Sequence, residues 1–253
     1  KSLSGRQPPI QGSAPNEVKM KPITACALFL GILTGVSTGA AQDSSRILSQ
    51  VDHLVYATPD LERTVADLER RLGVRATPGG QHPGRGTRNA LIALGANSYL
   101  EIIGPDPEQP STNLQSWWFS DLKEPRLVTW AAKGTELERL RDSAVSHGLA
   151  MTEVSAGSRK RPDGVLLSWR TVSPLGPAAG GIVPFFIDWG ESPHPALSSV
   201  KGVTLVGLRA EHPDASQVKE TLGRLGLDLP IAPGARSALI ATLEGPRGRV
   251  ELR

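Results

Sequence analysis

Apolar and polar residues alternate over residues 51–57 (VDHLVYA), a period typical of a β-strand. Residues 61–72 instead place apolar side chains three or four positions apart, which predicts a helix with one buried face. Thr58 can cap this helix, and Gly73 favours the backbone conformation that closes one. The pattern predicts a strand that runs directly into a helix packed on the same sheet.

The same order of elements recurs along the chain. DLER (60–63) and ELER (136–139) are 76 residues apart, which indicates an internal duplication. Residues 203–253 begin a third, weaker copy. The pattern therefore predicts an α+β fold of repeated βαβββ modules. The expected strands are 51–57, 74–77, 90–94, 98–103, 126–132, 165–172, 182–189, 203–209, 238–243 and 249–253, with helices at 61–72, 136–149 and 215–225.

The N-terminal residues have a different character. Residues 20–41 run from Met20 and Lys21 through a short apolar stretch to small residues ending at Ala41, the order of a secretory signal peptide. The apolar stretch is short for a membrane-spanning helix, which needs about 20 apolar residues. We expect residues 1–19 to be a disordered or artefactual leader, and the mature protein to be secreted or periplasmic without stable membrane insertion.

Loss of residues 1–41 changes the charge and the thiol chemistry of the chain. It removes four basic residues and one acidic residue, which leaves 24 of each in the mature chain. A balanced charge argues against a nucleic-acid-binding role. The single cysteine, Cys26, is lost as well, so thiol nucleophiles and cysteine-based zinc sites are excluded.

Four segments of the chain together resemble the glyoxalase-like domain family of the vicinal oxygen chelate superfamily. They are DHLVYATPDL, GGQHPGRGTRNALIALGANSYLEIIGPDPEQP, GSRKRPDG and PFFIDWGESPHP. The resemblance covers residues 50–197, with modules at 51–103 and 126–189, and residues 203–253 resemble a degenerate third module packed on them. It implies that paired modules curl into an open cup or barrel around one divalent metal.

Alternation along the strands places His53 and Glu101 on the faces that would line such a cup. By resemblance they match ligand positions for Zn, Fe, Mn or Ni, and Glu101 or another carboxylate of the cup would serve as the catalytic base. The second module offers Thr129 and Ile187 at the equivalent positions, and neither is a good ligand. His82 and His194, both in predicted loops, are the candidates to complete the set. A histidine hydrogen-bonded to a buried glutamate is the structural alternative.

Arg85, Arg88 and Asn89 precede and open a strand beside the predicted cup, where a guanidinium suits a carboxylate or phosphate. Arg159, Lys160 and Arg161 fit solvated loop charge better than a ligand site. No GxSxG, Walker A, dinucleotide-binding or HExxH motif occurs.

Three functions remain open from the sequence. The first is a cup that binds a small oxygenated, anionic compound, as a metal-dependent lyase, isomerase or ring-cleaving dioxygenase. The second is a metal-free protein that sequesters such a ligand. The third is a partner-binding role in which residues 203–253 mediate a homodimer.

Overall fold

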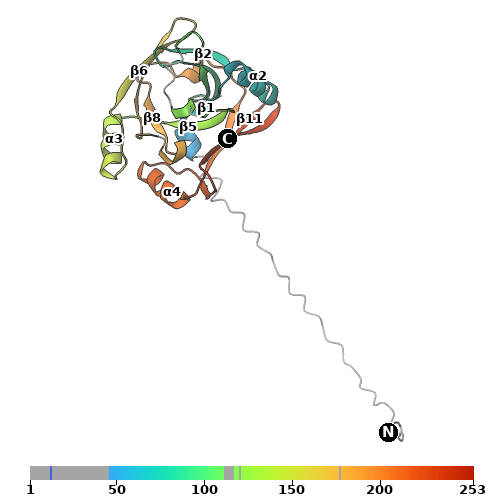
Figure 1. Cartoon of the computed structure of the whole chain (residues 1–253), viewed down its shortest axis with the longest axis vertical. Helices are drawn as coiled ribbons and strands as arrows, with labels where there is room; N and C mark the ends of the chain where they lie inside the picture. The colour runs from blue at the N-terminus through green and yellow to red at the C-terminus, as the bar shows by residue number, and fades with distance from the viewer. Residues whose placement is uncertain (1–11, 13–45, 111–116, 120, 177) are drawn as a thin grey trace, which may run out of the picture. The chain divides into compact units, whose positions relative to one another are not determined.

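The structure is a computed structural model that describes residue 12 and residues 46–253, except 111–116, 120 and 177 (Figure 1). Apart from Gly12, the predicted leader and signal peptide, with Cys26, lie outside the described residues and remain predictions. Among the residues described, no helix is both long and apolar enough to span a membrane.

The first module has the predicted order of elements, with two local differences. It comprises β1 (Val51–Ala57), α2 (Leu61–Leu72), β2 (Thr77–His82), β3 (Thr87–Gly95) and β4 (Ser98–Pro105). The cap of α2 is Asp60, whose side chain accepts from the Arg63 N–H, rather than Thr58. Strand β2 lies in the glycine-rich segment predicted to be a turn. A strand can form there despite Pro78 because β2 is at the edge of the sheet, where the missing N–H of proline is tolerated.

The second module repeats this order. It comprises β5 (Arg126–Lys133), α3 (Leu137–Ser146), β6 (Ser155–Lys160), β7 (Leu166–Val172) and β8 (Phe185–Asp188). The two modules form one eight-stranded sheet in the order β2-β3-β4-β1-β5-β8-β7-β6. Strands β1 and β5 meet antiparallel at its centre, pairing His53 with Ala131 and Val55 with Thr129. These two pairs are related by the offset of 76 residues, so the modules are joined about an approximate two-fold axis.

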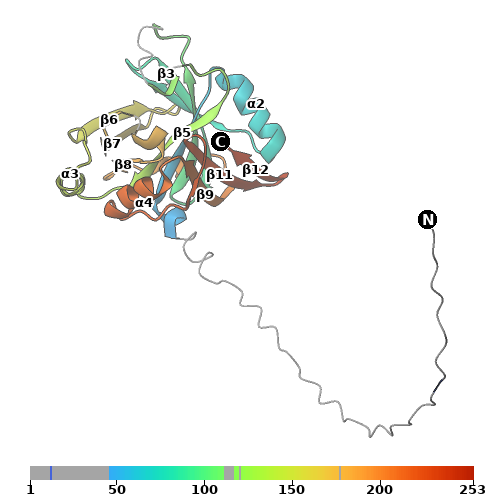
Figure 2. The same ribbon diagram turned by 60° about the horizontal axis from the view of Figure 1, so that its bottom comes forward.

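The C-terminal residues form a separate four-stranded sheet, in which β9, β11 and β12 lie side by side (Figure 2). Its elements are β9 (Thr204–His212), α4 (Ala215–Arg224), β10 (Ile231–Pro233), β11 (Ala238–Gly245) and β12 (Gly248–Leu252). The element order along the chain is that of a module, but the strand order is β10-β9-β11-β12 instead of β2-β3-β4-β1. This segment therefore repeats the pattern without repeating the topology.

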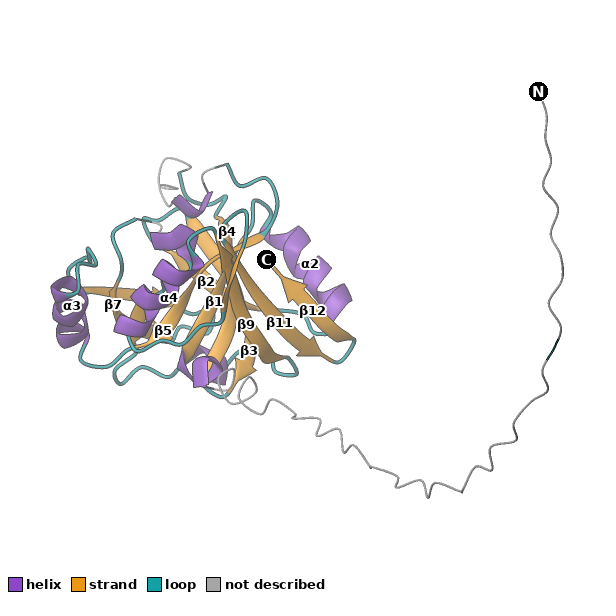
Figure 3. Cartoon of the chain, turned by 90° about the horizontal axis from the view of Figure 1, so that it is seen from below, coloured by secondary structure: helices purple, strands orange, loops and turns teal. Residues whose placement is uncertain are grey.

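One large apolar core joins all three segments, with the helices arranged around the strands (Figure 3). It contains Leu54 of β1, Leu68 of α2 and Leu243 of β11, each with no more than 1% exposed surface. Two smaller clusters line the inner side of the curved sheet, one around Val55 and Ile103 and the other around Tyr99. The inner side of the sheet thus carries two apolar clusters, with polar side chains such as His53 and Glu101 between them.

The two edges of the eight-stranded sheet meet and nearly close it into a barrel. Strands β2 and β6 stand at opposite ends of the strand order, yet the Arg159 guanidinium of β6 donates to the Gly79 carbonyl of β2. Gly80 has a φ of +127°, and a Cβ there would lie 2.8 Å from the Lys160 carbonyl oxygen. Glycine permits both this backbone conformation and this close approach. We call this contact the β2–β6 seam.

Candidate functional site

Strand β1 directs His53 into the interior of the barrel. Its neighbours Leu54 and Tyr56 belong to the large core beside α2, so the alternate side chains face inward. There His53 lines a cavity of about 560 Å³. Its ring stacks on that of Tyr99, with 4.6 Å between centroids, and only 3% of its surface is exposed. The imidazole is therefore held in one orientation by packing.

Asp52 fixes His53 from behind. An irregularity in the β1–β5 register between Val51 and His53 lets the Asp52 carboxylate reach the His53 Nδ1, 2.7 Å away. The Trp189 indole N–H also donates to Asp52, at 3.2 Å, and the His194 Nε2 lies 3.3 Å from it. Burial alone would raise the pKa of Asp52, but hydrogen bonds from His194 and His53 outweigh it and lower this pKa to about 2. Asp52 is therefore ionised and accepts from Nδ1, which leaves Nε2 of His53 facing the cavity.

Glu101 of β4 lies opposite that Nε2. The His53 Nε2 is 3.8 Å from Glu101 Oε2, and the Asn89 side-chain amide donates to Oε1 at 2.6 Å. Burial would raise the pKa of Glu101, but the electrostatic interactions with His53 and His82 and the Asn89 hydrogen bond lower it below its usual value. The cavity therefore contains a buried carboxylate that stays ionised at neutral pH.

His82 of β2 approaches the other side of the same carboxylate. Its Nε2 is 3.7 Å from Glu101 Oε1, and its Nδ1 lies 2.8 Å from the Thr87 hydroxyl. Burial lowers the pKa of His82, against the opposing effect of Glu101. His82 is consequently uncharged at neutral pH.

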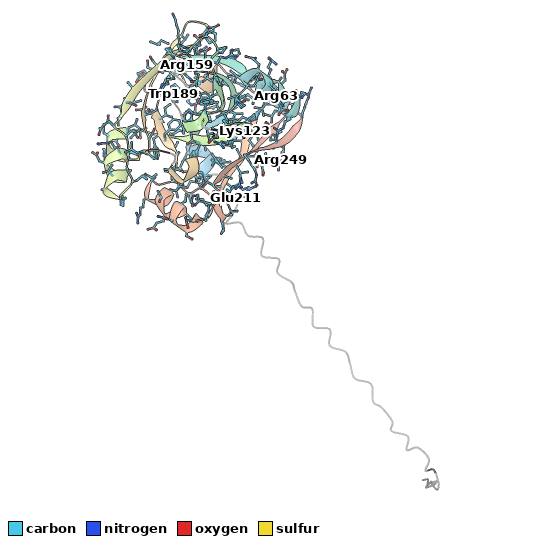
Figure 4. The ribbon with its side chains drawn as sticks, viewed as in Figure 1. Arg63, Lys123, Arg159, Trp189, Glu211 and Arg249 are labelled. Carbon is cyan, nitrogen blue, oxygen red and sulfur yellow. The ribbon has the colours of Figure 1, made fainter. Side chains whose placement is uncertain are left out.

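Two arginines line the cavity, and only one of them is among the predicted ligand-binding residues. Arg85 is exposed at the rim, whereas Arg159 is only 3% exposed. Arg88, a predicted ligand-binding residue, does not line the cavity. It pairs with Glu62 of α2 at 3.3 Å, because alternation along β3 directs it away from the interior. Figure 4 labels Arg159 and Trp189, both part of the cavity wall.

The side chains present do not fit a resident metal centre. The Asn89 side-chain amide lies between two of the predicted ligands, 2.6 Å from Glu101 Oε1 and 3.3 Å from the His82 Nε2, so it occupies the position where those two atoms would share an ion. His194, the other predicted ligand, is not brought to Glu101 but lies against Asp52. Within the described part of the chain, no group of three or more His, Cys, Asp or Glu side chains is arranged to hold an ion.

The strand register also corrects the equivalence of Glu101 in the second module. Strand β4 pairs Glu101 with Val55, and β8 pairs Phe185 with Ala131, the residue 76 positions after Val55. The counterpart of Glu101 is therefore Phe185 rather than Ile187. The Phe185 ring lies edge-on to the His53 ring, 5.4 Å between centroids, so an aromatic group replaces the second carboxylate.

Sequence reasoning missed Asp52 and Arg159. Strict alternation places Asp52 on the face opposite His53, and only the irregularity in the register brings the two side chains together. Arg159 lies on β6, a strand with no apolar alternation. The adjacent pair Asp52-His53 was the one visible signal, since a carboxylate often orients an imidazole.

A family model and a solved structure agree with this architecture. The model of the glyoxalase-like domain family matches residues 51–226. A hypothetical protein from Staphylococcus aureus of known structure is 14% identical, with a TM-score of 0.61 over 80% of this chain and 98% of that one, which shows a shared fold. Methylmalonyl-CoA epimerase from Mycobacterium tuberculosis is 20% identical over 60% of this chain and 93% of that one, with a TM-score of 0.40. No curated protein matches.

Proposed function

Because the chain belongs to the glyoxalase-like domain family of the vicinal oxygen chelate superfamily, we propose that its cavity binds a small oxygenated anion and that Glu101 exchanges a proton with that compound. The observation that carries the proposal is the ionised Glu101 carboxylate, buried in a cavity of about 560 Å³. Members of the superfamily commonly bind a divalent metal, but the donors present here do not fit one. The proton transfer is therefore attributed to the side chains themselves.

The charges of the cavity suit an anionic ligand. Arg85 at the rim and the buried Arg159 set two cations against the single carboxylate of Glu101. A guanidinium has five N–H donors in a fixed fork and binds carboxylates in a bidentate manner. The uncharged His82 adds a neutral polar group to the wall. An oxygenated carboxylate would find both a counter-charge and hydrogen-bond partners there.

Glu101 has the geometry of a general base. Its Oε1 accepts from Asn89, which holds the carboxylate in place, and its Oε2 faces the cavity beside His53. Oε2 would take a proton from a carbon next to a carbonyl group and return it to the product. The negative charge that develops on the carbonyl oxygen would be stabilised by an arginine of the wall. An isomerase or a lyase would use this step, and the fold alone does not choose between them.

Anion binding is tested by titrating lactate, mandelate and phenylpyruvate into the protein by calorimetry. We expect Arg85→Gln to raise the Kd of the carboxylates that bind by about threefold to tenfold. Arg88→Gln is the matched control, since Arg88 pairs with Glu62 outside the cavity, and it should leave Kd unchanged. Loss of binding in Arg88→Gln but not in Arg85→Gln would place the anion site elsewhere.

A second candidate is a protein that binds the anion without transforming it, favoured by the Asn89 hydrogen bond that already engages Glu101. Phenylpyruvate separates the two, because its C3 protons lie next to a carbonyl group and exchange in D2O. A base would raise the exchange rate above the buffer background, and Glu101→Gln would lower that increment by about 100-fold or more. Bound phenylpyruvate that exchanges only at the background rate would identify a binding protein.

A further inference from the structure

Aromatic residues are concentrated around the cavity. The sequence holds five Trp, four Phe and two Tyr, and among the side chains that the structure describes, five of these aromatic residues line this one cavity. They are Tyr99, Trp118, Trp169, Phe185 and Trp189. All except Tyr99, which is buried against His53, keep part of their surface exposed. A chain with only 4% aromatic residues thus places nearly half of them around a single ligand-sized space.

Trp169 and Trp189 form an angled wall. Their ring centroids are 5.4 Å apart and their planes are inclined by 57°, so neither ring covers the face of the other as in a parallel stack. The Trp189 indole N–H donates to Asp52, which fixes the orientation of that ring. Both rings also border an outer groove, so each ring lies between the cavity and that groove.

Gly157 holds Trp169 in this position. It pairs directly with Trp169 across β6 and β7, and a Cβ at Gly157 would lie 2.6 Å from two atoms of the indole. The ring therefore lies directly over the glycine backbone, in space that any larger residue would fill. Arg159 follows two positions along β6, about 6–7 Å further along the strand. An indole face and a buried guanidinium thus line the same cavity from neighbouring positions of the β6–β7 pair.

We propose that the ligand is an aromatic carboxylate, an aryl-substituted hydroxy or oxo acid whose ring packs on Trp169 and Trp189 while its carboxylate faces Arg159. This inference rests on the proposed function and adds the substrate class. A ring in an angled aromatic wall gains edge-to-face and offset contacts beyond simple burial of its area. A saturated ring of the same size buries similar area without those contacts.

The test compares mandelate with cyclohexylglycolate, which carries the same charge and nearly the same volume but no π-system. Calorimetric titration of the wild-type protein should give a Kd for mandelate lower by about threefold to tenfold. Trp169→Leu should reduce this ratio to near one. Gly157→Ala should reduce it as well, because it displaces the Trp169 ring without deleting any aromatic group. Leu166→Ala, an exposed position on the same strand, is the control that keeps the ratio unchanged.

Equal affinity for the two acids in the wild-type protein would overturn the aromatic class and leave anion binding intact. A preference for mandelate that survives both Trp169→Leu and Gly157→Ala would overturn the role of the wall. Failure of both acids, and of lactate and phenylpyruvate, to bind at millimolar concentration would overturn the proposed function together with this inference. If Trp169→Leu does not fold, the wild-type ratio and Gly157→Ala still decide the matter.

Discussion

Asp52 shows how one carboxylate can organise a site that it does not line. It is only 2% exposed, it lies 2.7 Å from the His53 Nδ1, and it also accepts from Trp189. Such a partner fixes both the tautomer and the orientation of an imidazole. Asp52 therefore couples the histidine of the first module to the aromatic wall of the second.

The ionisation of Asp52 links stability to pH. Its folded pKa of about 2 lies below the ordinary 3.8, so its contribution is present above pH 3.8 and is lost as pH falls towards about 2. The shift corresponds to about 2 kcal/mol. We expect Asp52→Asn to lower the free energy of unfolding by about that amount at pH 7, with a difference from wild type that shrinks below pH 4. Urea unfolding at several pH values measures this.

Asp67→Asn is the control for this prediction. Asp67 is half-exposed and pairs with Arg70 on the surface of α2, where an ion pair contributes roughly 0–1 kcal/mol. A difference between wild type and Asp52→Asn that stayed constant from pH 7 to pH 2 would show that ionisation is not its source.

At the scale of elements, close backbone contacts between segments depend on individual glycines. Gly245, at the end of β11, faces the C-terminus of α2, where a Cβ would lie 2.5 Å from the Leu72 carbonyl oxygen. Gly223 lies inside α4 with no atom within 4 Å of such a Cβ. A change of glycine to alanine should therefore lower the stability of the protein at Gly245 and raise it at Gly223.

We expect Gly245→Ala to lower the free energy of unfolding by about 1–3 kcal/mol, because backbone must move to admit the methyl group. Gly223→Ala should raise it by about 0.5–1 kcal/mol, since alanine is the better helix former. Thermal unfolding of the two variants beside wild type measures both. A stabilised Gly245→Ala would mean that α2 and β11 are not in contact.

How much of the fold could be predicted differs between central and edge strands. Apolar and polar residues alternate over residues 51–57 and 126–132, because each face of a central strand packs against a defined environment. The structure places β1 and β5 there. Of the edge strands, β12 matches its predicted range to within one residue, whereas β2 is displaced from its prediction and β6 and β10 have no predicted counterpart. An edge strand pairs on one side only and tolerates Pro, Gly and polar residues, so its sequence resembles a loop. The sequence around Arg159 indicates loop charge for the same reason.

At the scale of the whole molecule, the apolar core does not divide at the module boundaries. Leu205, Leu208 and Leu243 of the C-terminal sheet belong to the same buried cluster as Leu54 and Trp130. The repeat pattern predicted a third module, but not its different strand order, because hydrophobic periodicity does not specify which strands pair. The homodimer through residues 203–253 stays a prediction.

A shared core implies that the described segments unfold together. Leu243 has 0% exposed surface, and Leu243→Ala should cost about 2–5 kcal/mol. All five tryptophans precede residue 190, so tryptophan fluorescence reports on the modules alone. We expect Leu243→Ala to shift the fluorescence transition as far as the circular-dichroism transition, and Leu197→Ala, 60% exposed, to shift neither. An unchanged fluorescence transition in Leu243→Ala would show an independent C-terminal domain.

The β2–β6 seam is held by weaker contacts than the other strand pairs of the barrel. Elsewhere around its circumference, neighbouring strands are joined by backbone ladders, which break only at the expense of several hydrogen bonds at once. At the seam, the Arg159 side chain joins the two margins. The barrel would therefore open at the seam before it opens elsewhere, and the sheet would bend at β1 and β5, which lie at the centre of the strand order. The Arg159 guanidinium that would hold an anion also joins β2 to β6, and it has further N–H donors beside the one that Gly79 accepts, so a bound anion and the closed seam would share one side chain.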